Sequence, residues 1–275
     1  MKTDNQFQYQ RSKHLKDVTM LRAEINDFSY DKHAHEELSI GLTRQGLQHF
    51  NSSGSLQRSE PGNIVLFNPE QVHDGHGEAG NTLLYDMLYI HPQQLSRMLE
   101  AAGVRQVDSF RVGDNVLGDA LLRDSVLRLS QLISQQSNDA LILDYWLYQM
   151  CARMAAYQQE FVPNQVVRKA DQLLIKAKEF IQDHVRADIT LDDVGNAIGM
   201  SKYHFLRLFR SQFGITPHQY IISCKINAAR SALQSGTDLD DVVFDFGFSD
   251  LSHFNRRFKP IYGMTPKQYQ KSVLD

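Results

Sequence analysis

The fold is decided by residues 239–269, LDDVVFDFGFSDLSHFNRRFKPIYGMTPKQY, because they repeat the plan of residues 191–220, LDDVGNAIGMSKYHFLRLFRSQFGITPHQY. Both stretches begin with Leu-Asp-Asp-Val, pass a glycine and a serine, and end with Thr-Pro-x-Gln-Tyr. The second stretch has one extra residue between the serine and the first shared phenylalanine. An internal repeat of this kind indicates one structural unit that is used twice.

Each copy predicts a helix, a tight turn and a second helix. In the first copy Thr190 is a candidate N-cap, and Gly199 ends the helix because glycine adopts left-handed backbone angles at little cost. Ser201 then begins a second helix that extends to about Phe213. The equivalent positions in the second copy are Asp238, Gly247 and either Ser249 or Asp250. This is the helix-turn-helix arrangement.

The second helix of each copy has an apolar face and a polar face. Phenylalanines recur at helical spacing on one side, and arginine, asparagine or serine on the other. Arginine and asparagine suit the guanine and adenine edges of the major groove. A helical hairpin with a solvated charged face is the alternative, and the duplicated turn and caps favour the DNA-reading interpretation.

The residues between and before the two copies also predict helices. Apolar residues recur at helical spacing from Pro217 to about Gln234, so a rigid helix should fix the distance between the two reading units. Two units on one face of DNA would then enter successive major grooves, about one turn apart. Residues 173–185 predict the packing helix of the first unit.

Residues 173–269 resemble the DNA-binding domain of the AraC/XylS family of bacterial regulators. The most specific segments are GMSKYHFLRLF at 199–209 and DFGFSDLSHFNRRFK at 245–259. The resemblance implies activation rather than repression, and it implies base reading by Tyr203, Leu206, Arg207, Ser252, Asn255 and Arg256. Leu206 stands where the family often has a polar residue, which favours methyl contact or no base contact. Leu251 likewise weakens polar readout at the start of the second reading helix. The full set of candidate DNA-binding residues is Ser201, Lys202, Tyr203, Leu206, Arg207, Arg210, Ser252, Asn255, Arg256 and Lys259.

Residues from about Phe28 to Tyr89 are rich in predicted strands. Leu38–Leu42, Ile64–Phe67 and Leu83–Tyr89 are strand-like, and turn signals separate them. Several short strands at regular spacing predict a small antiparallel barrel or jelly roll.

The sequence has His33-Ala34-His35-Glu36-Glu37 and, further on, Pro61-Gly62-Asn63 and residues 69–73. These segments resemble the two cupin motifs and the sensor domain that often precedes this DNA-binding domain. The resemblance implies that His33, His35, Glu37 and His73 could hold Zn, Ni, Mn or Fe. Alternatively these side chains line the pocket, or titrate and hydrogen-bond a polar ligand. The candidate effector pocket comprises His33, His35, Glu37, His73 and Tyr85. Nearby acidic residues favour a cationic or amino-acid-like effector; they are Glu36, Glu37, Asp74 and Asp86.

Residues 117–159 predict two helices that are broken near Ser134 to Asp139. Their apolar stripes could cover the barrel, and a surplus of apolar surface favours a homodimer, as the resemblance implies. The predicted division is a sensor and dimerisation domain at 1–160, a linker at 161–169 and the DNA-binding domain at 170–275.

Composition narrows the class of protein. With 42% hydrophobic residues the chain can bury a core, and its two cysteines lack any zinc-finger spacing. No apolar segment is long enough to cross a bilayer or to resemble a signal peptide, so a cytoplasmic location is expected. Net charge is −3, but residues after 165 are mildly basic, as expected of a DNA-facing domain.

The leading hypothesis is an α+β transcription regulator, not an enzyme, that binds double-stranded DNA under the control of a small-molecule effector. An activator would also contact RNA polymerase. Two alternatives remain open. One is a cupin metalloenzyme with an appended helical domain, and the other is a DNA-binding protein without an effector.

Overall fold

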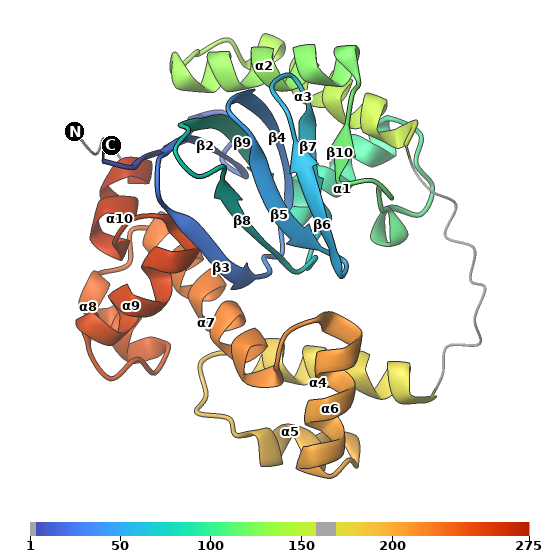
Figure 1. Cartoon of the computed structure of the whole chain (residues 1–275), viewed down its shortest axis with the longest axis vertical. Helices are drawn as coiled ribbons and strands as arrows, with labels where there is room; N and C mark the ends of the chain where they lie inside the picture. Colours follow the sequence, from blue (N-terminus) through green and yellow to red (C-terminus); the bar gives the residue numbers. More distant parts are fainter. Residues whose placement is uncertain (1–3, 158–168, 275) are drawn as a thin grey trace. The chain divides into compact units, whose positions relative to one another are not determined.

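The computed structural model describes residues 4–157 and 169–274. The described residues form two compact units, and each is considered by itself: residues 4–30 and 36–157 make up the first, and residues 31–35 and 169–274 the second. The predicted linker at 161–169 lies, apart from Lys169, outside the described residues. The first unit is rich in strands and the second is helical, which confirms the predicted α+β class (Figure 1).

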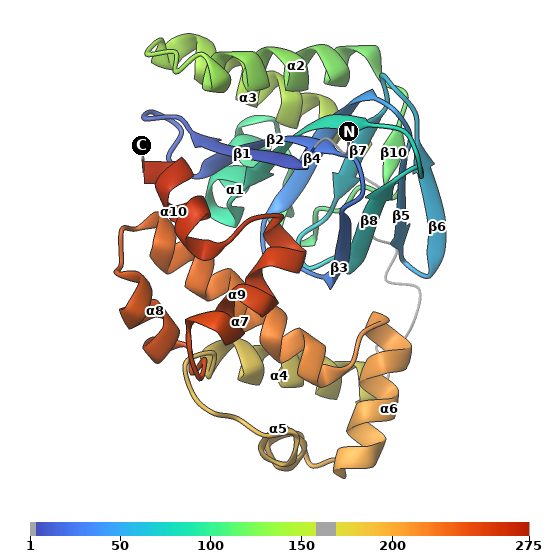
Figure 2. The same ribbon diagram turned by 60° about the vertical axis from the view of Figure 1, so that its left-hand side comes forward.

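The N-terminal unit is built on two antiparallel sheets. The larger has the order β1-β2-β9-β4-β7-β10 and the smaller the order β3-β8-β5-β6 (Figure 2). Their strands are β1 (Gln6–Arg11), β2 (Val18–Ile25), β3 (Ser29–His33), β4 (Leu38–Gln45), β5 (Gln48–Ser52), β6 (Ser55–Ser59), β7 (Ile64–Phe67), β8 (His73–Gly77), β9 (Leu83–Ile90) and β10 (Val116–Leu117). The structure confirms the predicted strands, whereas β1 and β2 precede the region in which strands were expected.

One face of the larger sheet packs against helices. Successive side chains of a strand point to opposite faces, so Met20, Ile40 and Leu88 share this face, and the three are fully buried. They join one core with Leu122 and Met150 from the helices above. Burying each such side chain contributes roughly 1.5–3 kcal/mol.

The helices of this unit are α1 (Pro92–Ala101), a single 3₁₀ turn η1 (Val107–Ser109), α2 (Ala120–Ser134) and α3 (Ala140–Ala155). The break between α2 and α3 lies where the sequence predicted it. Asp119 caps α2 and also accepts hydrogen bonds from Arg153 and Tyr157 at the end of α3. These contacts, Arg153 first, hold the pKa of Asp119 well below its usual value.

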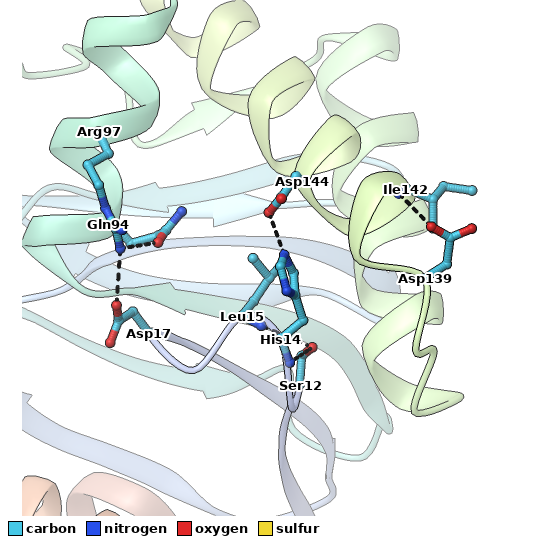
Figure 3. A network of polar contacts seen from close by, with 9 residues as sticks. All are labelled: Ser12, His14, Leu15, Asp17, Gln94, Arg97, Asp139, Ile142 and Asp144. Carbon is cyan, nitrogen blue, oxygen red and sulfur yellow. Dashed lines mark hydrogen bonds and ion pairs between the residues drawn. The ribbon is translucent and has the colours of Figure 1, made fainter.

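Polar contacts attach the helices to the turn between β1 and β2 (Figure 3). His14 Nε2 lies 2.9 Å from Asp144 Oδ1 of α3, and Arg97 Nη2 of α1 lies 3.4 Å from Asp17 Oδ2. Asp139 caps α3 by accepting a hydrogen bond from the Ile142 amide. Polar contacts therefore attach α1 and α3 to the turn between β1 and β2, in addition to the apolar core that the helices share with the sheet.

The C-terminal unit consists of helices arranged around a long central one, α7 (Pro217–Gln234). On one side lie α4 (Lys169–Asp183), α5 (Leu191–Ile198) and α6 (Lys202–Phe213). On the other lie α8 (Leu239–Asp245), α9 (Leu251–Tyr262) and α10 (Pro266–Leu274). The predicted linking helix is confirmed with its bounds, and the predicted helix at 173–185 is observed as α4.

Candidate nucleic-acid interface and sensor site

The first helix-turn-helix unit is formed by α5 and α6. The Thr190 amide donates to Asp193 Oδ2 at 2.7 Å, and the Asp193 amide donates to Thr190 Oγ1 at 3.2 Å, which makes a complete capping box. The Thr190 hydroxyl, and after it the Thr190 amide, donate to the Asp193 carboxylate and lower its pKa. Gly199 ends α5 with φ of 68°, a left-handed conformation that costs glycine little, as predicted.

The α6 helix is held by its aromatic face and presents its polar face to solvent. Phe205 and Phe209 are fully buried, with ring centroids 5.5 Å apart. Tyr203 is 85% exposed, and Arg207 and Arg210 are exposed beside it. The remaining candidates of this helix start are Ser201, whose side chain makes no cap hydrogen bond, Lys202, whose Nζ lies 2.9 Å from Asp192 Oδ2, and the half-buried Leu206.

The second unit repeats this plan with α8 and α9. Asp250, rather than Ser249, caps α9 by accepting from the His253 amide at 2.7 Å, and that bond lowers the pKa of Asp250. Phe254 and Phe258 are fully buried with centroids 5.4 Å apart. Of the candidate side chains, Ser252, Arg256 and Lys259 are exposed and Asn255 is half-buried.

A repeated hydrogen bond ties each unit to the helix before it. Gln182 of α4 donates to the Tyr220 hydroxyl at 3.2 Å, and Gln234 of α7 donates to the Tyr269 hydroxyl at 2.6 Å. Each tyrosine ring also lies 5.5 Å from a reading-helix phenylalanine. The unit that is used twice therefore includes the preceding helix. The two glutamines were not predicted from the sequence, although both precede a copy of the repeat.

The structure brings together three of the four predicted metal ligands. One side-chain nitrogen from each of His33, His35 and His73 lies within 4.8 Å of the others, and all three residues are buried. Glu37 is buried but is not part of this group. Burial, and then the neighbouring His33, lowers the pKa of His35 well below its usual value, which favours the neutral ring that binds metals.

Backbone carbonyls orient two of these imidazoles. His33 Nδ1 donates to the Asp31 carbonyl at 2.6 Å, and His73 Nδ1 donates to the Gln71 carbonyl at 2.8 Å. The Nδ1–H tautomer leaves Nε2 as the nitrogen through which a ligand or metal would be held. The predicted pocket residue Tyr85 has its hydroxyl 2.6 Å from that of Tyr30.

Two of the four acidic side chains that favoured a cationic effector, Asp86 and Asp74, have partners in the structure. Asp86 is paired with Arg22, and Asp74 accepts hydrogen bonds from the Asn51 amide and side chain. Glu36 is exposed. The negative charge of Asp86 is therefore balanced by the protein.

Comparison with known proteins defines the class. A family profile described as a helix-turn-helix domain matches residues 194–272, and one described as an AraC-like ligand binding domain matches residues 15–150. The HTH-type transcriptional regulator YbfI of Bacillus subtilis is 30% identical over 225 residues, which cover 82% of this chain and 81% of that protein. The lactose operon transcription activator of Staphylococcus xylosus is 22% identical, over 90% of this chain and 88% of its own.

Among solved structures, ToxT of Vibrio cholerae has the same fold, with a TM-score of 0.59 and 11% identity over 94% of this chain and 98% of its own. The chain is thus a DNA-binding transcription regulator with a sensor domain for a small-molecule effector. It belongs to the AraC family of transcriptional regulators. The names of its relatives favour a regulator over the metalloenzyme alternative. Within the described residues, no helix is long and apolar enough to cross a membrane.

Proposed function

We propose that this chain is a transcription activator that reads an asymmetric DNA site with α6 and α9. The observation that carries the proposal is that equivalent helices of a duplicated unit expose Arg207 and Arg256, each opposite a fully buried phenylalanine face. Exposed arginines on a helix that projects from its own core are suited to guanine edges. The other candidate DNA-binding side chains supply phosphate or additional base contacts.

Genome-wide mapping of bound sites tests this proposal. The wild type should occupy discrete sites, and the double variant Arg207→Ala/Arg256→Ala should lose them. Arg58→Ala, which removes an exposed arginine of β6, is the matched control. An unchanged map in the double variant would contradict the proposal. Genes beside the bound sites would also indicate activation or repression.

We propose that the effector binds beside the three histidines, with Glu37 and Tyr85 as further candidate contacts. The support is that His33, His35, His73 and Glu37 are buried polar side chains and that the three imidazoles lie close together. The names of similar proteins suggest the first probes: lactose, xylose and an unsaturated fatty acid, the ligand bound in one ToxT structure. A ligand that binds the folded state raises the melting temperature. His35→Gln should abolish that shift, and a shift of unchanged size would refute the assignment.

The histidine group also fits a divalent metal, since three imidazoles with two fixed Nδ1–H tautomers are an ordinary donor set for zinc. A bound metal would supply a charged anchor for the effector. After equilibration with zinc chloride, one zinc per chain is expected in the wild type and none in His73→Gln. His76→Gln, which alters an exposed histidine of β8 outside the group, should keep its zinc. A metal-free wild type would contradict the proposed metal site.

We propose a homodimer that forms through α3. Leu141, Tyr145 and Tyr148 recur at helical spacing and are 81%, 50% and 37% exposed. Exposed apolar residues gathered on one helix face mark an interaction surface. Sedimentation should show a dimer for the wild type and a monomer for Leu141→Lys/Tyr145→Lys. The control Leu56→Lys, on β6, should stay dimeric, and a dimeric double variant would contradict the interface.

The same proposal includes RNA polymerase as a partner of the DNA-bound activator and a cytoplasmic location, where the chromosome is reached. We also propose that the chain consists of a sensor and dimerisation domain at 1–160, a linker at 161–169 and a DNA-binding domain at 170–275. Transcription in vitro with purified polymerase checks the partnership with RNA polymerase, since activation should require no other protein.

A further inference from the structure

A second pocket lies on the larger sheet of the N-terminal unit, away from the histidine group. It has a volume of about 210 Å³ and spans strands β1, β2, β9 and β4. Its polar lining comes from residues at alternating strand positions, including Arg22 and Glu24 of β2, which face the same side as the buried Met20. The pocket therefore lies on the same face of the larger sheet as Met20, which α2 helps to bury. The Arg22 Nη1 contact to Ser134 Oγ, at 3.4 Å, places the C-terminal end of α2 beside it.

Strand register arranges the lining residues in two rows across the sheet. In one row Gln6 is opposite Glu24, and Glu24 is opposite Leu84. In the other row Gln8 is opposite Arg22, and Arg22 is opposite Asp86. Glutamine amides thus lie at one end of both rows.

Arg44, which lies on β4, lines the end of the pocket opposite the glutamines. The pairing of β4 with β9 shifts register between Thr43 and Gln45, so Arg44 is the extra residue of a β-bulge. Bulges re-aim a side chain and are common beside binding sites. Glu24 and Arg44 lie on strands on either side of β9, two strand spacings or about 10 Å apart along the sheet.

The charged side chains of the pocket differ in how firmly they are paired with one another. Asp86, only 1% exposed, accepts from Arg22 Nε at 2.9 Å and from Arg22 Nη2 at 3.1 Å. Arg22 is therefore committed to Asp86 and Ser134. Arg44 reaches Asp86 with a single nitrogen at 3.5 Å, which leaves most of its guanidinium donors to the pocket. Within the described parts of the chain, the side chains of Glu24, Gln6 and Gln8 form no hydrogen bond or ion pair.

We propose that this pocket binds a free α-amino acid with a polar side chain. Arg44 holds the carboxylate, Glu24 holds the ammonium group, and Gln6 or Gln8 bonds the side chain, while Leu84 forms an apolar floor between the two charges. Among the described residues Glu24 lacks a partner and Arg44 has a single 3.5 Å contact to Asp86, so the two line one small pocket with charge available to a ligand. They complement a zwitterion better than a simple anion or cation. This site is separate from the effector site proposed beside the histidines.

Isothermal titration of the full chain with each of the common L-amino acids tests the proposal. At least one polar amino acid should bind, and Arg44→Gln and Glu24→Gln should each weaken binding by about tenfold or more. Arg58→Gln, on an exposed arginine paired with Glu60, should bind as the wild type does. The best ligand should lose affinity when its amine is acetylated and, separately, when its carboxylate is converted to an amide.

No binding of any L-amino acid to the wild type would overturn the proposal. Binding that persists in Arg44→Gln, or N-acetyl derivatives that bind as tightly as the parent amino acid, would overturn it too. Loss of binding in His35→Gln but not in Arg44→Gln would move the ligand to the histidine site. DNA binding by the same variants is measured separately, so a failure here is distinguishable from a failure of the proposed DNA-reading function.

Discussion

The two helix-turn-helix units share a plan but differ in where their caps are strong. In the first, the supporting helix α5 has a full capping box, whereas the reading helix α6 begins at Ser201 without a side-chain cap. In the second, the reading helix α9 is capped by Asp250, and the short supporting helix α8 has only Asp238. The duplicated plan thus fixes the backbone, while each copy stabilises a different helix start.

The exposed faces differ as well. The first unit presents an 85% exposed tyrosine, Tyr203, with two arginines, whereas the second presents serine, arginine and lysine. On the supporting helices the equivalent positions are Asn196 and the 84% exposed Phe244. Two unlike reading faces in one chain require a site with two unlike halves, so the difference between the copies sets the asymmetry of the DNA sequence.

The largest effect on stability is expected in the aromatic core that each of the two units has. Phe209→Ala and Phe258→Ala should each reduce the free energy of unfolding by about 3–5 kcal/mol, because both rings are fully buried among other aromatic rings. Chemical denaturation measures the loss. Leu56→Ala, at an exposed position, is the control. If only one variant is destabilised, the two cores are not equivalent.

Exchange of one residue between the copies tests the tight turn. Gly195 and Val243 occupy the same position of the repeat, but a Cβ at Gly195 would lie 2.8 Å from the Met200 carbonyl oxygen. Gly195→Val should therefore destabilise the chain by about 1–3 kcal/mol although valine is tolerated in the other copy. Thermal unfolding reports the effect, and a variant as stable as the wild type would show that the two turns have the same backbone path.

Arg207→Ala and Arg256→Ala compare the two reading faces on DNA. Each should weaken binding to a mapped site by about 1–3 kcal/mol and relax specificity in a different half of it. Gel shift with sites mutated in one half measures both effects. Equal loss of specificity in the same half would contradict the assignment of one helix to each half, and unchanged affinity for both variants would remove the arginines from the interface.

The smallest effect concerns pH. Hydrogen bonds lower the folded-state pKa of Asp193 and Asp250 below the unfolded value of about 3.9. Their contribution to stability is therefore present above that pH and is lost as pH falls through it toward the folded pKa. The melting temperature should fall between about pH 5 and about pH 3. Asp193→Asn and Asp250→Asn should each make this fall shallower, and an unaltered pH profile would show that the caps are interchangeable with neutral ones.

The C-terminal fold could be predicted from the sequence almost completely. Helix positions, the turn glycines and the caps at Thr190 and Asp238 are local features, set by residues a few positions apart. The N-terminal unit was predicted less fully. β1 alternates Phe7 and Tyr9 with glutamines but has too few apolar residues to be recognised alone, and its pairing partner β2 follows after a turn.

The sequence by itself determined that a helix-turn-helix unit is used twice and that its two reading faces differ, because side-chain periodicity and turn residues act over short distances. Only the tertiary structure decided which polar residues meet. It brought together His33, His35 and His73 but left Glu37 outside the group, paired Asp86 with Arg22, and placed Arg44 and Glu24 around one pocket. Those contacts join strands that are far apart in the chain, and strand order and register, which short-range patterns do not specify, decide them.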